Sequence, residues 1–197
     1  MRLIVFYYMV KFIIMPVQFS YDSNVTISNM KGAAKVEILY PGRYRHYKGN
    51  DYEVIGEATH SETMEALVVY RALYGACGLW VRPKAMFLEV VMVGGKTVSR
   101  FQPIIVIQVW RCETGGQQHG YFQQFEVSSR EPLSVMTLLD KVYEQGGAFA
   151  CRTSTCFKGK CDSCQVKVNG QEVFDCVKLV NPGETVIIEP SAKCNSR

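Results

Sequence analysis

The sequence contains little histidine, and it lacks the short motifs of the common catalytic sites. Three of its 197 residues are histidines, and His46 and His60 occur in unrelated contexts, so no histidine-based metal or catalytic site is predicted. A glycine-rich phosphate-binding loop, a nucleophile elbow and a pair of catalytic carboxylates are also missing. The sequence therefore indicates no site for a small-molecule substrate, and catalysis would need a separate partner protein.

The apolar N-terminal stretch is too short for a membrane-spanning helix. Residues 3–10 and 12–17 are apolar, but Lys11 separates them, and a spanning helix needs about 20 apolar residues. The stretch imitates a secretory signal peptide, yet no small-residue cleavage site follows it. We therefore interpret residues 1–30 as an apolar leader, which is either a misassigned translation start or a weak membrane anchor.

Acidic and basic residues are unevenly distributed between the two halves of the chain. Residues 1–103 contain 12 Lys and Arg against 8 Asp and Glu, whereas the remainder contains 10 of each class. The net charge of +4 therefore lies in the first half. This division, together with the linker-like residues 101–103, predicts a first domain at 38–103 and a second domain at 104–190, with a tail at 191–197. Each domain is close to the lower size limit for a self-sufficient core.

Four of the eight cysteines lie close together near the C-terminus. Cys156, Cys161 and Cys164 lie within nine residues, and Cys176 follows after a gap of 11 residues. A short loop that provides three thiolates, with a fourth from a neighbouring strand, is a ligand arrangement of [2Fe–2S] clusters. Thiolate sulfur also suits iron–sulfur centres better than oxygen or nitrogen does. These four cysteines are therefore predicted to hold a [2Fe–2S] cluster.

Other interpretations of the cysteines stay open at this point. Four thiolates also form closed structural zinc sites, although zinc ribbons usually present two CxxC pairs and this chain presents one, at Cys161 and Cys164. Cys151 is an alternative to Cys156 as a ligand, and a loop without metal is a third interpretation. Disulfides are not predicted, because the chain shows no secreted cysteine framework. The remaining cysteines are scattered and are interpreted as plain thiols: Cys77, Cys112 and Cys194.

The residues after the cysteine loop predict how the fourth cysteine reaches it. Residues 166–168 and 172–174 alternate as short strands do, and Asn169 followed by Gly170 is a strong hairpin signal. The second of these strands delivers Cys176 beside the loop.

A helix and further strands are predicted around this hairpin. The helix begins after Ser134 and ends at Gly146 and Gly147. Its apolar face, at helical spacing, consists of Val135, Leu138, Leu139, Val142 and Tyr143. Strands are predicted at 104–110, 121–127 and 185–188, with the first two paired as a hairpin. The order predicts an α+β fold in which one helix crosses a small sheet.

With these motifs, residues 104–190 resemble the N-terminal, β-grasp [2Fe–2S] ferredoxin domain of the iron–sulfur subunits of succinate dehydrogenases and fumarate reductases. The matching segments are residues 136–140, 156–164 and 168–170, then Cys176 and residues 188–190. The gap before Cys176 is shorter than the corresponding last gap in plant-type ferredoxins. Small subunits of molybdenum hydroxylases share the spacing, but the closing residues 188–190 favour the succinate dehydrogenase type. The resemblance implies electron transfer between a flavoprotein partner and a further acceptor.

Two departures from that family stand out. The family usually has glycine after the second cysteine, where this chain has Asp162, a residue type for which positive φ is comparatively tolerable. No second cysteine set follows Cys176 before Arg197, so a single cluster is expected. Lys158 and Lys160 lie within the loop, where they would offset the negative charge of a reduced cluster or contact an acidic partner, unless they simply face solvent.

The first domain resembles a short bacterial domain of unknown function. The resemblance rests on residues 44–49, 68–75, 80–83 and 86–87. It implies a small β-rich, barrel-like fold, and it implies no activity. Strands are predicted at 51–55, 67–70 and 88–93.

A second candidate binding region lies in the first domain, at residues 43–48 and 80–84. Rings alternate there with charged side chains: Tyr44, Arg45, His46, Tyr47 and Lys48, then Trp80, Arg82 and Lys84. Such an alternation on a sheet face stacks bases and neutralises phosphates, so nucleic acid or another anionic ligand is one interpretation. The alternative is a solvated strand with its rings turned into the core.

Three functional hypotheses follow from these features. The first is a cytoplasmic one-electron transfer protein that works with a flavoprotein, with membrane association through the partner or the leader as a variant. The second is a non-enzymatic binding or regulatory protein in which a cluster or a zinc ion is a structural element. The third is a fusion of two halves that act independently.

Overall fold

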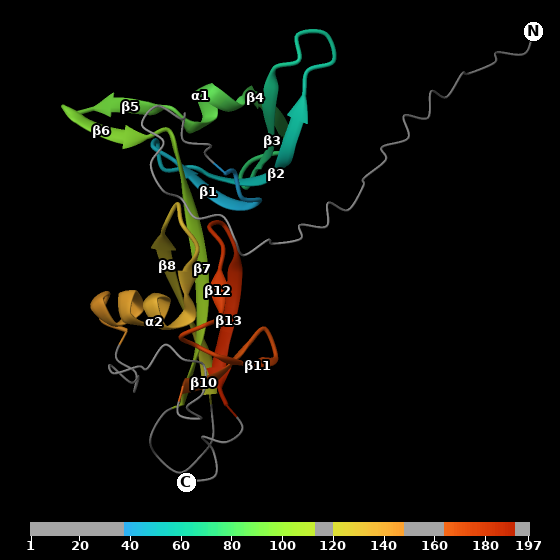
Figure 1. Cartoon of the computed structure of the whole chain (residues 1–197). Coiled ribbons are helices and arrows are strands. Elements are labelled where there is room, and N and C mark those ends of the chain that lie inside the picture. The colour runs from blue at the N-terminus through green and yellow to red at the C-terminus, as the bar shows by residue number, and fades with distance from the viewer. Residues whose placement is uncertain (1–37, 113–119, 148–163, 192–197) are drawn as a thin grey trace, which may run out of the picture. The chain divides into compact units, whose positions relative to one another are not determined.

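The computed structural model describes residues 38–112, 120–147 and 164–191 (Figure 1). The elements of the first part are β1 (Gly42–His46), β2 (Asp51–Thr59), β3 (Ala66–Ala72), β4 (Leu79–Pro83), α1 (Lys84–Leu88), β5 (Val90–Val93) and β6 (Lys96–Ser99). They are followed by β7 (Phe101–Cys112), β8 (Gly120–Ser128), β9 (Leu133–Ser134), α2 (Val135–Glu144), β10 (Gln165–Val168), β11 (Gln171–Phe174), β12 (Leu179–Val180) and β13 (Thr185–Pro190).

The long strand β7 connects the two predicted domains directly. Its first residues pair with β1, with Tyr44 opposite Pro103 and His46 opposite Phe101. The rest of the strand pairs with β8 on one hand and with β13 on the other. Figure 1 shows β7 as one continuous ribbon through both groups of strands. The prediction of a linker at 101–103 is therefore wrong, because these residues are the start of a strand.

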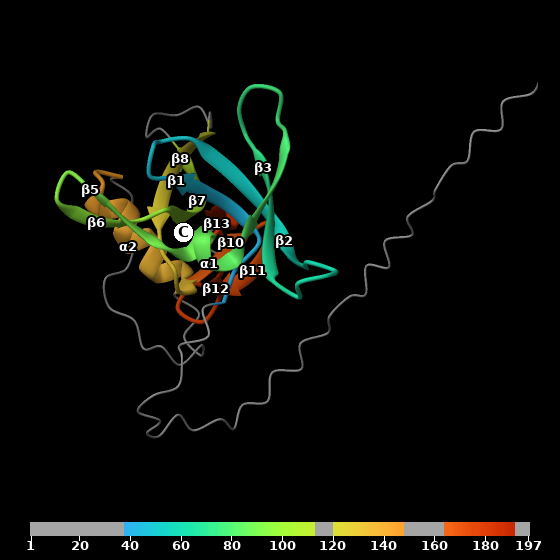
Figure 2. The same cartoon turned by 90° about the horizontal axis from the view of Figure 1, so that it is seen from above.

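The main sheet is open at its ends. Its order is β11-β10-β13-β7-β1-β2-β3-β4, with β8 paired to β7 outside this path. Figure 2 shows β5 and β6 side by side as a hairpin of their own. The other sheets among the described residues are two-stranded, one of β9 and β12 and one of β5 and β6. Within the residues that the structure describes, no sheet returns to its first strand. The predicted barrel in the first domain is therefore not confirmed, although its β-rich character is.

The core of the first domain is mainly aromatic. Its buried residues are Tyr44, Val54, Val68, Tyr70, Phe87 and Phe101. The rings of Phe87 and Phe101 stack, with centroids 4.0 Å apart. The predicted strands at 51–55 and 67–70 lie within β2 and β3. The strand predicted at 88–93 begins later, at Val90, because Leu88 is the last residue of α1.

The core of the second domain is aliphatic, and α2 covers its sheet. Strands β7 and β8 form the predicted antiparallel hairpin, and β13 lies parallel to β7. The buried cluster consists of Ile105, Ile107, Val109, Val127, Val135, Leu138, Leu139, Val142, Val168, Val180, Val186 and Ile188. Four of these side chains come from α2, so the amphipathic helix closes the core of this domain.

Helix α2 begins and ends where its sequence predicts. The Ser134 hydroxyl accepts a hydrogen bond from the Thr137 backbone N–H, which caps the N-terminus. At the other end, Gly146 has φ +84°, and the N–H groups of Gly146 and Gly147 donate to carbonyls in the last turn. One residue of the predicted apolar face differs from the others: Tyr143 is 58% exposed.

Polar and backbone contacts join the two domains beside β7. Arg45 forms ion pairs with Asp51 in the first domain and with Glu126 in the second, with N–O distances of 2.8 Å in both pairs. The Arg43 N–H donates to the Gly183 carbonyl at 2.8 Å. Gly42 has φ +124°, and a Cβ there would lie 2.2 Å from the Gly183 oxygen. The domains are therefore in close contact through backbone as well as side chains.

The predicted leader, residues 1–30, lies outside the described residues. Among the residues that are described, neither helix has the length and apolar character that crossing a bilayer requires. The predicted tail at 191–197 is described at Ser191 alone, whose side chain is buried.

Candidate metal centre

A short hairpin brings two of the predicted cysteine ligands together. Strands β10 and β11 pair in register from Gln165 opposite Phe174 to Val168 opposite Gln171. Asn169 and Gly170 at the turn have φ values of +49° and +81°, as a two-residue hairpin turn requires. Cys164 precedes β10 and Cys176 follows β11, so the hairpin places both at its open end. The predicted hairpin is therefore confirmed.

The N-terminus of α2 holds the segment that carries Cys176. The Met136 N–H donates to the Asp175 carbonyl and the Val135 N–H donates to the Lys178 carbonyl, both at 3.0 Å. The Asp175 N–H in turn donates to the Cys164 carbonyl at 2.9 Å. The first two bonds use N–H groups of the first turn of α2, which have no partner within the helix. The turn is therefore fixed to the hairpin on one side and to the helix on the other.

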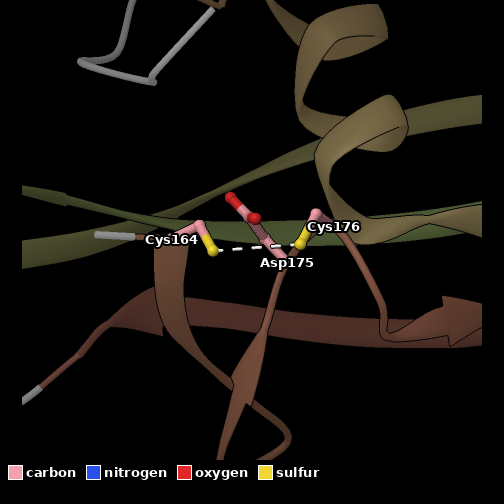
Figure 3. A group of neighbouring side chains, drawn as sticks. All are labelled: Cys164, Asp175 and Cys176. Carbon is pink, nitrogen blue, oxygen red and sulfur yellow. Dashed lines mark hydrogen bonds between the residues drawn. The ribbon is translucent and has the colours of Figure 1, made fainter. Parts of the chain in front are cut away.

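The two sulfur atoms lie close together in a buried position. The Sγ atoms of Cys164 and Cys176 are 3.9 Å apart and point toward one another (Figure 3). The two residues are 4% and 7% exposed and pack against Met136, with Phe174 beside them. Two sulfur ligands of one tetrahedral metal ion, each about 2.3 Å from the metal, are separated by about 3.8 Å. The pair therefore fits two ligands of the same metal ion.

Asp175 is a third potential donor that sequence reasoning missed. One of its carboxylate oxygens lies with the two sulfurs in a group whose ligand atoms are all within 4.8 Å of one another (Figure 3). Burial raises the pKa of this carboxyl, against hydrogen bonds from the Cys176 backbone and the Cys164 side chain that lower it. Its position next to Cys176 is visible in the sequence, but no spacing rule distinguishes it from an ordinary turn residue.

Several predicted features of the site lie outside the described residues. They are the ligands Cys156 and Cys161, the alternative ligand Cys151, the loop residues Lys158, Lys160 and Asp162, and the side chains of Cys112 and Cys194. Cys77, which the sequence presents as a plain thiol, is exposed and carries a positive φ of +51° in the first domain.

Comparison with known families identifies both parts of the chain. Residues 42–103 match a family described as a protein of unknown function (DUF1653). Residues 106–196 match the 2Fe–2S iron–sulfur cluster binding domain. The two resemblances drawn from the sequence motifs are therefore confirmed, and the match supports a [2Fe–2S] cluster rather than zinc.

Individual relatives match one part of the chain at a time. One subunit of the fumarate reductase (CoM/CoB) of Methanothermobacter marburgensis is 33% identical over 90 residues, which are 44% of this chain and 17% of that subunit. This chain therefore spans a small part of that relative's length. A crystal structure of a DUF1653 protein from Bordetella bronchiseptica is 40% identical, with a TM-score of 0.31, and the match covers 32% of this chain and 83% of that one.

Proposed function

Because residues 106–196 are a 2Fe–2S iron–sulfur cluster binding domain, we propose that the protein transfers single electrons through one [2Fe–2S] cluster. The observation that carries this proposal is the buried sulfur pair of Cys164 and Cys176 within that domain. When bound, such a cluster takes up one electron and releases it again. The surrounding residues have to hold it, keep water away and stabilise the added negative charge.

The proposed ligands are the four cysteines of the predicted set. Cys164 and Cys176 would hold one iron, because their sulfurs have the separation of two ligands on a tetrahedral ion. Cys156 and Cys161 would hold the other iron. Each iron then has two protein sulfurs, as a [2Fe–2S] cluster with four thiolate ligands requires.

The residues around the sulfur pair suit a centre that gains negative charge. The N-terminus of α2 lies against the turn that carries Cys176, since Met136 bonds to that turn and packs on both cysteines. The positive end of a helix dipole stabilises nearby negative charge, typically by about 0.3–1 kcal/mol. Met136 and Phe174 cover the sulfurs with apolar surface.

The proposed partner is a flavoprotein oxidoreductase. The similarity to a fumarate reductase subunit supports this choice, and no catalytic site is predicted within the chain itself. We place the protein in the cytoplasm, because thiolate ligands persist in a reducing compartment.

An anaerobic redox titration followed by electron paramagnetic resonance tests this proposal. We expect one signal that appears on one-electron reduction and disappears on reoxidation. A protein that retains its metal but shows no reversible signal would contradict electron transfer. That result would favour the alternative, a binding or regulatory protein with a structural four-cysteine site.

Removal of one proposed ligand tests the site itself. Cys176→Ala should abolish cluster binding, because one iron loses a thiolate that the buried site cannot replace with water. Cys77→Ala is the matched control, since that thiol is exposed and lies in the other domain. Iron content and visible absorption measure the result. Equal loading of the two variants would remove Cys176 from the ligand set.

A further inference from the structure

One face of the first domain collects the aromatic side chains that alternate with basic residues in the sequence. Cross-strand pairs place Tyr44 opposite Tyr52, and Tyr70 opposite Trp80. Arg82 lies opposite Val68 two residues further along β4. Because alternate residues of a strand share a face, His46 lies on the same face as Tyr44. This surface, which we call the aromatic face, is carried by β1, β2, β3 and β4.

Part of the aromatic face is buried and part is exposed to solvent. We call the exposed part the open part. Tyr44, Tyr70 and Phe101 are buried beneath Phe87 of α1. Away from this core, large rings are exposed: Trp80 is 56% exposed, Tyr74 is 46% exposed and Tyr47 is 38% exposed. The prediction that the rings turn inward is therefore correct for Tyr44 and wrong for Tyr47 and Trp80.

Two of the three exposed rings, Tyr47 and Tyr74, pack against aromatic neighbours. The His46 ring lies 4.4 Å from the Tyr47 ring and 4.8 Å from the Phe101 ring, between centroids. The Tyr74 ring packs edge-on against Tyr52 at 5.5 Å, and their hydroxyls are 2.6 Å apart. Contacts of this kind hold a ring in one orientation. The Tyr47 and Tyr74 rings are therefore held by their neighbours while one side of each stays exposed.

The charge around this open part is positive. The His46 pKa is lowered first by burial and then by the nearby cations Arg100, Arg82 and Lys48. Arg82 donates to the Tyr70 hydroxyl at 3.3 Å and lies over the Phe101 ring, and Lys48 lies over the Tyr47 ring. Arg100 pairs with Glu89. Among the described residues, neither Lys48 nor Arg82 forms an ion pair with a carboxylate.

Two predicted members of the basic set do not belong to this surface. Arg45 is on the opposite face of β1 and is held by Asp51 and Glu126. Lys84 is paired with Glu57 at 2.6 Å. The cations left for a ligand are therefore Lys48 and Arg82, with Arg100 partly neutralised.

We propose that the open part of the aromatic face binds single-stranded nucleic acid, with Trp80, Tyr74 and Tyr47 stacking on bases and Lys48 and Arg82 contacting phosphates. Rings that stack on successive bases, interleaved with cations, are how sequence-tolerant single-strand binders work. The rings come from β4, from the β3–β4 turn and from the turn after β1. The three strand intervals from β4 to β1 span about 14 Å, which is wider than one stacked base. A duplex is a poor match, because its bases are already stacked on one another.

Fluorescence anisotropy of the full-length, cluster-loaded protein with a labelled oligothymidylate of about 12 nucleotides tests this proposal. We expect binding that weakens with salt at a log–log slope of about −1.4, as two neutralised phosphates predict for a single strand. Trp80→Ala should weaken binding by about 5- to 150-fold, and Arg82→Gln should reduce the slope by about 0.7.

Two control variants keep the test specific. Val81→Ala changes an exposed residue of the same strand on the opposite face, and Lys96→Gln removes an exposed cation from β6. Neither should change affinity by more than about twofold, the usual size of an exposed surface effect. Circular dichroism confirms that each variant is folded.

Three results would overturn the proposal. The first is no binding of the oligonucleotide at about 50 mM salt and about 100 µM protein, where even non-specific binders associate. The second is equal competition by adenosine monophosphate, which would identify a small-nucleotide site. The third is a wild-type dimer that Trp80→Ala converts to a monomer, which would assign the exposed edge of β4 to a second copy of this chain.

Discussion

The two ends of β7 enter cores of different chemistry. Phe101 packs into a cluster in which four of the six buried side chains are aromatic. Ile105, Ile107 and Val109, a few residues later, lie in a cluster whose buried members are all aliphatic. Helix α2 closes the aliphatic core, and the candidate metal ligands of this domain, Cys164 and Cys176, lie at the open end of the β10–β11 hairpin. The aromatic core continues into an exposed face, so in that domain the same residue types build the core and the candidate binding surface.

The difference also bears on whether the halves act independently. A fusion of unrelated halves would be expected to have a flexible joint, yet β7 pairs with β1 and with β13 without interruption. The Gly42 and Gly183 backbones meet directly beside it. We therefore predict that the two cores unfold together.

The largest effect is expected from removing a ring at the shared strand. Phe101→Ala should lower the free energy of unfolding by about 3–5 kcal/mol, as deletion of a buried aromatic ring does. Ile107→Ala, in the other core, should cost about 2–5 kcal/mol. Because both residues lie on β7, each variant should shift one common thermal transition in calorimetry. Two separate transitions, with each variant moving a different one, would show that the cores are independent.

A smaller effect is expected at the backbone contact between the domains. Gly42→Ala should cost about 1–3 kcal/mol, the usual range for overpacking, because the new Cβ meets the Gly183 oxygen. Gly49→Ala is the matched control: it also has positive φ, at +95°, but its Cβ would meet nothing within 4 Å. Comparing the melting temperatures of the two variants separates the effect of the Gly183 contact from the effect of the positive φ. Equal losses would mean that the Gly183 contact contributes nothing.

The smallest effect is expected from the ion pair of Arg45 and Asp51, which lies within the first domain next to this junction. The hydrogen bond from Arg45 lowers the Asp51 pKa, against burial, which raises it. A depressed aspartate pKa adds stability above the ordinary value of about 3.9 and loses it as the pH falls through the lower value in the folded state. Asp51→Asn should therefore cost up to about 1 kcal/mol at pH 7, with the difference fading below about pH 4. Denaturant titrations of both proteins across this range measure it, and a constant difference would contradict the ion-pair account.

Local signals predicted the parts of the fold that local chemistry determines. The turn at Asn169 and Gly170 and the cap at Ser134 were correct because each depends on residues within a few positions. The convergence of Cys164 and Cys176 could be predicted because the hairpin between them is short. The same reasoning failed at residues 101–103, where Gln102 and Pro103 were interpreted as a linker between two domains. Their strand character comes from pairing with β1, which is distant in the sequence.

Long-range arrangement also explains the other misses. The strands of the first domain were predicted, but a closed barrel was not confirmed. Closure depends on whether the two edge strands of the sheet pair with each other, and these strands are distant in the sequence. Arg45 and Lys84 were grouped with Arg82 by sequence spacing. Lys84 pairs with Glu57, 27 residues away, and Arg45 pairs with Asp51 on the neighbouring strand and with Glu126, 81 residues away. Asp175 was missed because its approach to the sulfurs depends on the bonds between its turn and α2. Apart from the Arg45–Asp51 pair across the β1–β2 hairpin, these contacts join residues too far apart in the sequence for local rules to connect.

The central claim is that the second domain binds a [2Fe–2S] cluster. Anaerobic purification followed by iron and acid-labile sulfide analysis, with a visible absorption spectrum, tests it most directly. The account predicts a coloured protein with about two irons and two sulfides per chain. A colourless protein that contains zinc, or no metal, after purification without oxygen would contradict it.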